Sequence, residues 1–366
     1  MQKINAKRWL SGILAAILLL AVFPLGTFAE EGDLTITTKE ELLQFAQSVS
    51  GGESYTGKTV VLAANLSLAG EDFAGIGSSA APFKGTFDGQ NHIVSDLSSS
   101  VGFFADVNGG TVKNLIVRGM VNGASNIAGV VGKLTAGAVQ NCGNEASVSG
   151  GANVGGVVGS VNGDCTVSGC YNSGAVSGTT GYIGGVTGQH WRAGTVENCY
   201  NIGTVSGPAT VGGITGGHKA SSPVLRNCYS AGTVVDTAGN QNNIGAVIGA
   251  TRGTNENCYF LSGCGTNDKT GITEVSSLSA SQLGDAFKAD EDGINGGLPV
   301  FAWQIRQPDL IITTYEALKS FAEAVSGGES YEGKLVRLGA NITLGGESSP
   351  WTPIGTASAP FKGTFD

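Results

Sequence analysis

The chain has 366 residues, of which 60 are glycine and 13% are charged. The glycines follow no G-X-Y period, which excludes collagen, and a hydrophobic fraction of 41% argues against simple disorder. Lys and Arg number 20 against 29 Asp and Glu, a net charge of −9. This acidic balance gives no electrostatic basis for binding nucleic acid, whose phosphates attract clustered cations.

Residues 1–29 have the pattern of an export signal. A basic start precedes an apolar run at 13–23, and Ala29 offers a small residue for cleavage. The alternative is an uncleaved membrane anchor, but the run is short for a span and Pro24 interrupts it. Cleavage would remove three basic residues and leave 17 against 29 acidic ones, a net charge of −12. We expect a secreted or bacterial cell-surface protein with no membrane association after cleavage.

The segment 30–100 is expected to form an N-terminal cap and the first rungs of a repeat structure. Residues 37–49 predict a short amphipathic helix, in which Thr38 and Glu41 match a capping box. Apolar residues recur on one helix face at Leu42, Phe45 and Val49. We expect this helix to cover the open end of a stack of strands, whose edges would otherwise be unpaired.

Residues 101–265 contain a repeat of about 28 residues. Each copy opens with an apolar, Gly-rich stretch, and a cysteine follows some ten residues later. These cysteines are Cys142, Cys170, Cys199, Cys228 and Cys258. A period of this length is too short for a propeller blade and lacks helical periodicity. At about 3.3 Å per residue it extends to about 90 Å, which suits one closed, three-sided coil of a parallel β-solenoid.

Aligning the copies on the cysteine indicates the role of that position. Leu115 occupies it in the first copy, and leucine can replace a core residue but neither a metal ligand nor a nucleophile. A second apolar column lies three residues earlier, at Val112, Val139, Val167, Val196 and Leu225. A third lies six residues later, at Val121, Val148, Val176, Val205 and Val234, and ends in Cys264. The odd spacing of the first two columns predicts a bend between them.

We interpret the seven cysteines as buried free thiols in preference to disulfides or metal ligands. Exported proteins often contain disulfides, but side chains in register point the same way and the number is odd. A zinc site is weaker still, because no C-x₂-C pair or histidine partner accompanies the cysteines. Cys165 lies off both columns and is the candidate for a reactive or accidental thiol.

Polar residues form two further columns just before the cysteines. The residue before the cysteine position is asparagine in most copies, at Asn114, Asn141, Asn198, Asn227 and Asn257. We expect these side chains to form an amide-to-amide ladder at a corner of the coil. Gly169 interrupts that ladder. One residue earlier the chain is polar and variable, which predicts a solvated stripe in which Glu197, Arg226 and Glu256 are axial neighbours.

The cap sequence returns at the end of the chain. Residues 312–344 copy 36–68, and "PFKGTFD" at 82–88 recurs at 360–366. We interpret 266–311 as the C-terminal end of one module, with one helix, a Gly-Pro turn and a terminal strand within 279–304. Residues 312–366 are then the start of a second, incomplete module, as in a fragment of a longer protein.

The repeat resembles the GLUG motif of bacterial surface proteins. Its Gly-x-hydrophobic-Gly core stands at 129–132, 156–159, 185–188 and 213–216, while Ala246 and Ala105 replace a glycine in two other copies. The resemblance covers roughly residues 80–265 and implies an all-β fold, a right-handed parallel β-helix. It also implies a place in large exported proteins, including adhesin-like proteins and non-catalytic parts of IgA-cleaving metallopeptidases.

Parallel β-helices include pectate lyases, so an enzyme must be considered. Asp88, His92 and Asp96 are the strongest acid-base candidates, although "FDG" reads equally well as a turn. His190 and His218 stand in equivalent positions 28 residues apart, where one coil of stacking could pair them as a weak metal site. Two exposed loop histidines are the commoner explanation. Trp191 could contact a sugar or protein partner.

Our interpretation is a non-catalytic surface protein, a stalk or adhesive module, with no catalytic, cofactor-binding or metal residues assigned. Its partner would be a host or matrix protein or a glycan. The alternatives are a carbohydrate-active, pectate-lyase-like β-helix enzyme, or the accessory region of a larger surface metallopeptidase whose active site lies beyond residue 366.

Overall fold

The computed structural model describes residues 34–239, 243–267, 269–305, 308–344 and 351–366. The predicted signal at 1–29 lies outside the described residues. The chain divides into two compact units. The first holds the described residues up to Asp290 together with Asn295–Pro299, and the second holds Glu291–Ile294 and Val300–Asp366. Among the described residues, no helix combines the length and the apolar character needed to cross a bilayer.

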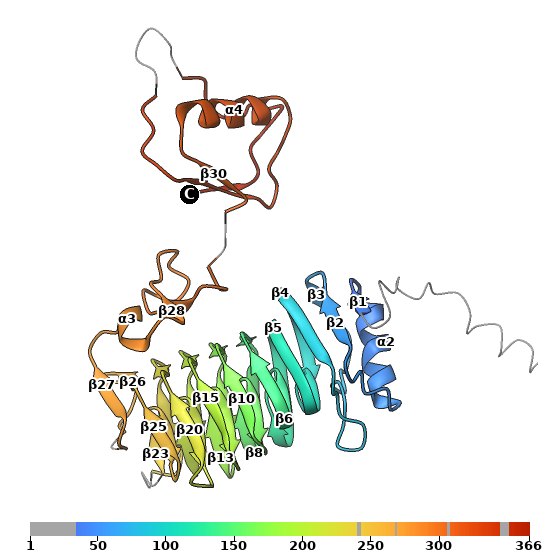
Figure 1. Cartoon of the computed structure of the whole chain (residues 1–366), viewed down its shortest axis with the longest axis vertical. Helices are drawn as coiled ribbons and strands as arrows, with labels where there is room; N and C mark the ends of the chain where they lie inside the picture. The colour runs from blue at the N-terminus through green and yellow to red at the C-terminus, as the bar shows by residue number, and fades with distance from the viewer. Residues whose placement is uncertain (1–33, 240–242, 268, 306–307, 345–350) are drawn as a thin grey trace, which may run out of the picture. The chain divides into compact units, whose positions relative to one another are not determined.

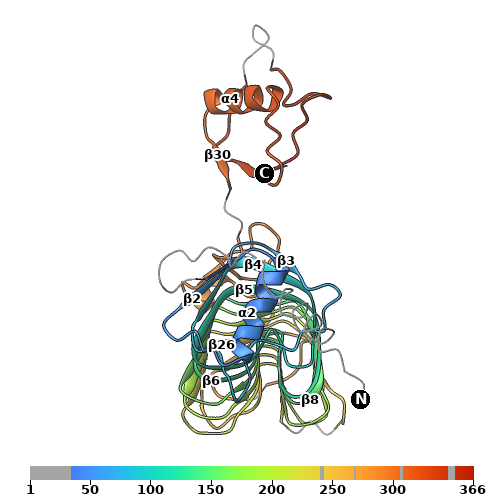
Figure 2. The same cartoon turned by 90° about the vertical axis from the view of Figure 1, so that its right-hand side faces the viewer.

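The first unit begins with the predicted cap. Its elements are β1 (Leu34–Ile36), α2 (Lys39–Ser50), β2 (Thr59–Leu62) and β3 (Leu66–Ser67). Thr38 and Glu41 form the capping box, and Leu42, Phe45, Ala46 and Val49 are buried. The Phe45 ring packs on Tyr55, Phe83 and Phe87, with centroids 5.0–6.0 Å apart. The helix therefore covers the first coils at one end of the stack, as expected (Figures 1 and 2).

The rest of the first unit is a parallel β-solenoid, which confirms the predicted fold class (Figure 1). It starts with the long strands β4 (Thr86–Ser99) and β5 (Phe104–Ile127), and the three coils from β10 to β24 divide into five short strands each. In these coils the strands are therefore short, and each coil has more of them than the three sides that were expected. The handedness implied by the resemblance stays a prediction.

Equivalent strands of successive coils pair in register and form columns. The first column contains β6 (Val131–Gln140), β10 (Cys165–Ser168), β15 (Gly194–Glu197), β20 (Pro223–Arg226) and β25 (Thr254–Glu256). The second contains β7 (Gly143–Asn144), β11 (Tyr171–Asn172), β16 (Tyr200–Asn201), β21 (Tyr229–Ser230), β26 (Cys258–Leu261) and β27 (Ile272–Val275).

Three further columns complete the coil. One contains β8 (Ser147–Gly155), β12 (Val176–Gly178), β17 (Val205–Gly207) and β22 (Val234–Asp236). The next contains β13 (Tyr182–Gly184), β18 (Thr210–Gly212) and β23 (Ile244–Gly245). The last contains β9 (Val158–Val161), β14 (Thr187–His190), β19 (Thr215–His218) and β24 (Ile248–Ala250).

The interior of the solenoid confirms the predicted apolar columns. The valine columns pair residue by residue and are buried from Val112 and Val121 onward, except for Val234, which is half-buried. We call the set Leu115, Cys142, Cys170, Cys199, Cys228 and Cys258 the cysteine column. All of its members are buried, and the seven cysteines of the chain are free thiols. Cys165, the candidate for a reactive or accidental thiol, is 2% exposed and pairs in register with Gly137 and Gly194. Its burial favours the accidental thiol of the two interpretations.

The asparagine before each cysteine makes the bend between the apolar columns. Asn114, Asn141, Asn198, Asn227 and Asn257 all have φ between 50° and 54°, and Gly169 has φ 62°. Asparagine and glycine are the residues that adopt this left-handed conformation most easily. The amides bond along the stack, from Asn141 to Asn114 at 3.2 Å and from Asn257 to Asn227 at 2.9 Å. The predicted corner ladder is confirmed.

A second asparagine ladder, which we did not predict, lies inside the coil. Asn144, Asn172 and Asn201 are fully buried, and each donates to the next at 2.7 Å. The first glycine of the Gly-x-hydrophobic-Gly motif lies against these amides, since a Cβ at Gly156 would overlap the Asn172 side chain. The repeated glycine is therefore required by close approach to a buried amide.

The C-terminal part contains short elements and a second cap. It comprises α3 (Ala280–Leu283), β28 (Phe287–Lys288), β29 (Val300–Phe301), β30 (Leu310–Ile312), α4 (Tyr315–Ser326), β31 (Leu335–Leu338) and β32 (Thr364–Phe365). The helix expected within 279–304 is only four residues long. In the second unit, Phe321 packs on Tyr331 and Phe361 as Phe45 packs on Tyr55 and Phe83. The predicted second copy of the cap is confirmed.

Candidate functional site

The acid-base candidates at the start of the solenoid are each committed to a local contact. Asp88 accepts hydrogen bonds from Asn114 Nδ2 at 2.9 Å and Gln90 N at 3.0 Å, and pairs with Lys113. Burial alone would raise the pKa of Asp88, but these hydrogen bonds hold it below its ordinary value. Asp88 is thus the terminal acceptor of the corner ladder, and its lowered pKa favours the ionised form.

The other two members of that group also have structural partners. Asp96 accepts from Ser67 Oγ at 2.6 Å, which lowers the pKa of Asp96. His92 Nδ1 lies 3.2 Å from Asn65 Oδ1. The contacts tie these side chains to the neighbouring coil, and no hydrogen bond joins Asp88, His92 and Asp96 to one another among the described residues.

The histidine pair differs from the expectation of exposed loop residues. His190 and His218 end β14 and β19, pair in register and are 0% and 2% exposed. They continue an apolar column, which we call the histidine column: Val107, Leu134, Val161, His190 and His218. Their rings lie edge to face with centroids 5.4 Å apart. Stacking does bring them together, as the spacing suggested, but inside the coil.

The environment of the two imidazoles keeps them neutral. Neither ring nitrogen of His190 has a hydrogen-bond partner, and His218 has only Thr251 Oγ1, 3.4 Å from its Nδ1. Burial lowers the pKa of His190 to about 4, and burial together with His190 lowers the pKa of His218 to about 3. Among the described residues, no group of three or more His, Cys, Asp or Glu side chains is placed to hold a metal ion.

A groove of about 560 Å³ lies beside His218 on the last coils. Its origin is a loss of side-chain volume along one column, which runs Asp106, Lys133, Ser160, Gln189, Gly217 and Ala250. The Tyr182 ring lies over Gly217, since a Cβ there would be 3.0 Å from Tyr182 Cε1. Gly217 and Ala250 have smaller side chains than Asp106, Lys133 and Gln189, which occupy the same column on earlier coils.

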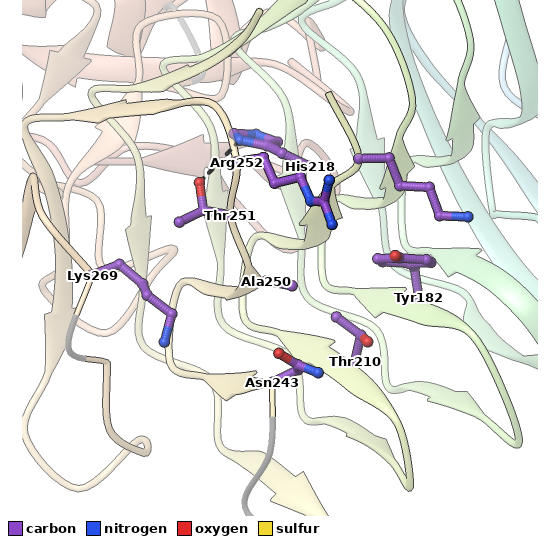
Figure 3. Close-up of a pocket in the computed structure, with 9 residues that line it drawn as sticks. Tyr182, Thr210, His218, Asn243, Ala250, Thr251, Arg252 and Lys269 are labelled. Atoms are coloured by element: carbon purple, nitrogen blue, oxygen red, sulfur yellow. Dashed lines mark hydrogen bonds between the residues drawn. The ribbon is translucent and has the colours of Figure 1, made fainter. Parts of the chain in front are cut away.

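The groove is lined by cations, hydroxyls and an amide. One wall is formed by Tyr182, Thr210 and Asn243, from the column of β13, β18 and β23. Ala250 lies between this wall and the side chains of Thr251 and Arg252, and Lys269 lies at one end (Figure 3). Lys219, which follows His218, completes the lining. Among the described residues the lining includes no Asp or Glu, although the chain as a whole is acidic.

The sequence analysis did not identify most of the residues that line the groove. It did identify Trp191, which contacts the lining residue Lys219: Trp191 is 44% exposed, and the Lys219 ammonium lies 4.3 Å from its ring centroid. Tyr182, Lys219, Arg252 and Lys269 gave no motif. The groove could have been suspected from the change to small residues at Gly217 and Ala250, but this change is visible only after the coils are aligned.

Comparison with known proteins supports the fold. No family model matches the chain, and no curated protein sequence matches it. The crystal structure of a candidate immunoglobulin A1 protease from Bacteroides ovatus is similar, with a TM-score of 0.59 and 20% sequence identity. The match covers 77% of this chain and 95% of that one. At this identity the similarity establishes a shared fold.

Proposed function

We propose that this chain is a non-catalytic, exported protein of the bacterial cell surface whose solenoid carries a ligand-binding groove. The lining of the groove is the observation that carries the proposal. It combines three cations with hydroxyls, an amide and a tyrosine, and its described residues include no carboxylate pair of the kind that glycoside hydrolysis uses. Such a set can hold a ligand by charge and hydrogen bonds without providing an acid and a base.

The repeat sequence and the export pattern support the same proposal. A β-solenoid with the Gly-x-hydrophobic-Gly motif is typical of GLUG-repeat, adhesin-like proteins, and residues 1–29 favour export. The solenoid presents its outer face in register over many coils, so a binding residue on one coil is held rigidly by its neighbours.

A second candidate function follows from the structural neighbour. Because that neighbour is described as an immunoglobulin A1 protease candidate, the chain could serve as the accessory region of a larger surface peptidase. In that role the solenoid would still bind or position a partner. The pectate-lyase-like alternative is not favoured, because Asp88 and Asp96 hold neighbouring coils together.

The test combines localisation, adhesion and turnover. We expect the full chain expressed in its bacterial host to be recovered from the surface or the medium. Labelled chain should adhere to surfaces coated with glycans or matrix proteins and should release no product from polygalacturonate or immunoglobulin A. Retention in the cytoplasm, or product formation abolished by Asp88→Ala, would contradict the proposal.

A further inference from the structure

Two cations of the groove, Lys219 and Arg252, differ from the paired cations of the solenoid surface. Lys219 Nζ lies 4.3 Å from the Trp191 ring centroid and 5.1 Å from that of Tyr182, so two aromatic faces fix the ammonium. Neither Lys219 nor Arg252 has an ion-pair partner among the described residues. This contrasts with Arg226 on the polar stripe, which pairs with Glu197 at 2.6 Å. A preorganised cation with no counter-charge favours an anionic ligand.

The remaining polar groups suit a sugar better than a peptide. Thr210, Thr251 and Asn243 present hydroxyl and amide groups that can bond to sugar hydroxyls. A peptide that added a strand would need free backbone groups. Here the backbone already bonds between coils, from Trp191 N to Val161 O and from Lys219 N to His190 O.

The groove continues into a second hollow of about 490 Å³. The two share Thr251 and Lys269, and the second adds Thr254, Asn255 and Thr270. Each has the size of a small-ligand site. Two adjoining hollows of similar chemistry fit neighbouring residues of one oligosaccharide.

We propose that this groove binds an acidic oligosaccharide, with the carboxylate of one sugar between Lys219 and Arg252 and its hydroxyls on Thr210, Asn243 and Thr251. The inference rests on the proposed binding function and specifies its ligand class. The carboxylate can belong to a uronic acid or to a sialic acid, since both place a planar anion on a sugar ring.

Calorimetric titration of the full chain with trigalacturonate and with 3′-sialyllactose tests the inference and separates the two sources. Maltotriose and lactose are the neutral controls of matching size. We expect at least one acidic sugar to bind more than tenfold more tightly than its neutral control, and binding to weaken as salt rises. Ala250→Trp, which fills the groove, and Arg252→Ala should each weaken binding at least tenfold.

Arg226→Ala is the matched control, because it removes the same charge from the polar stripe and should leave sugar binding unchanged. Circular dichroism and thermal melting verify that each variant is folded. If Ala250→Trp does not fold, Arg252→Ala and Lys219→Ala carry the test. Equal binding of neutral sugars, no effect of the groove variants, or equally tight binding of poly-L-glutamate would overturn the inference, the last in favour of an acidic protein partner.

Failure of this inference is distinguishable from failure of the proposed function. If the chain adheres to coated surfaces but acidic sugars do not bind, the ligand class is wrong while the binding role stands. If acidic sugars bind in the groove and are cleaved, the ligand class stands while the non-catalytic role is wrong.

Discussion

Two columns of the same coils are filled in different ways. The cysteine column keeps one kind of small apolar residue from Cys142 to Cys258, and all of its members are buried. The histidine column changes from aliphatic residues to His190 and His218, which are equally buried. The change occurs on the coils that form the groove, and His218 lines it.

The two columns differ because one only packs between coils, whereas the other passes beside the groove. A column that repeats its residue needs only to fill the same space on every coil, and small apolar side chains do this at little cost. Burying imidazole nitrogens with few partners is unfavourable. The solenoid tolerates it where the outer surface also departs from the repeat, at Gly217 and Ala250. Columns that lose their regularity therefore indicate where a repeat protein does more than stack.

The largest effect is expected for thiol reactivity. A thiol reagent should label the cysteine column in the native chain at least about a hundredfold more slowly than in denaturant, because reaction requires local opening. Burial also raises the pKa of Cys199 and Cys228, which makes the reactive thiolate scarce. Cys264, at 9% exposure, is an internal reference that should label sooner. Mass spectrometry of labelled peptides measures the rates, and rapid native labelling of most cysteines would refute the closed coil.

The buried asparagine ladder offers the next largest effect. Asn172→Leu should lower the free energy of unfolding by about 3 kcal/mol, because it leaves the buried amides of Asn144 and Asn201 without their partner. Asn172→Ser is the control, since Ser230 occupies the equivalent place on a later coil, and it should cost less. Urea denaturation followed by circular dichroism measures both. A leucine variant as stable as the serine variant would show that the ladder is dispensable.

The histidine column should make stability depend on pH. In the unfolded chain the pKa of histidine is about 6.5. In the folded chain the pKa falls to about 4 at His190 and to about 3 at His218. The contribution of each neutral histidine is therefore fully present above pH 6.5 and is lost as pH falls toward the folded pKa. For His190 the loss amounts to about 3 kcal/mol.

His190→Val tests this directly, because Val161 fills the same column one coil earlier. The variant should lose less stability than the parent chain between pH 7 and pH 4.5 in urea denaturation. Parallel pH curves for the two proteins would mean that His190 is not a buried neutral group.

The smallest effect is expected at the corner of the coil. Asn198→Ala should cost about 1 kcal/mol, because alanine is strained at φ 50°. Asn198→Gly should cost less, since Gly169 occupies this corner with φ 62°. Thermal melting compares the two. If the glycine variant were less stable than the alanine variant, the stability that Asn198 contributes would come from its amide hydrogen bond with Asn227 and not from its backbone conformation.

The period, the register and the apolar columns that line the coil could all be predicted from the sequence. Val112 pairs with Val139, Leu115 precedes Cys142 in the cysteine column, and Asn198 bonds to Asn227. Each was predictable because in-register stacking places equivalent residues of successive repeats in contact. The capping helix was predictable because its capping box and apolar face are local patterns.

The tertiary structure alone decided which side chains turn inward at the bends and where the surface is hollow. His190 was expected in an exposed loop and the inward position of Asn172 was not predicted, because alternation no longer indicates direction where a strand breaks after two to four residues. The groove depends on the volumes at Gln189, Gly217 and Ala250, and on walls contributed by Tyr182 and Arg252. These residues are far apart in the chain, and only the stacking of coils gives them a common surface.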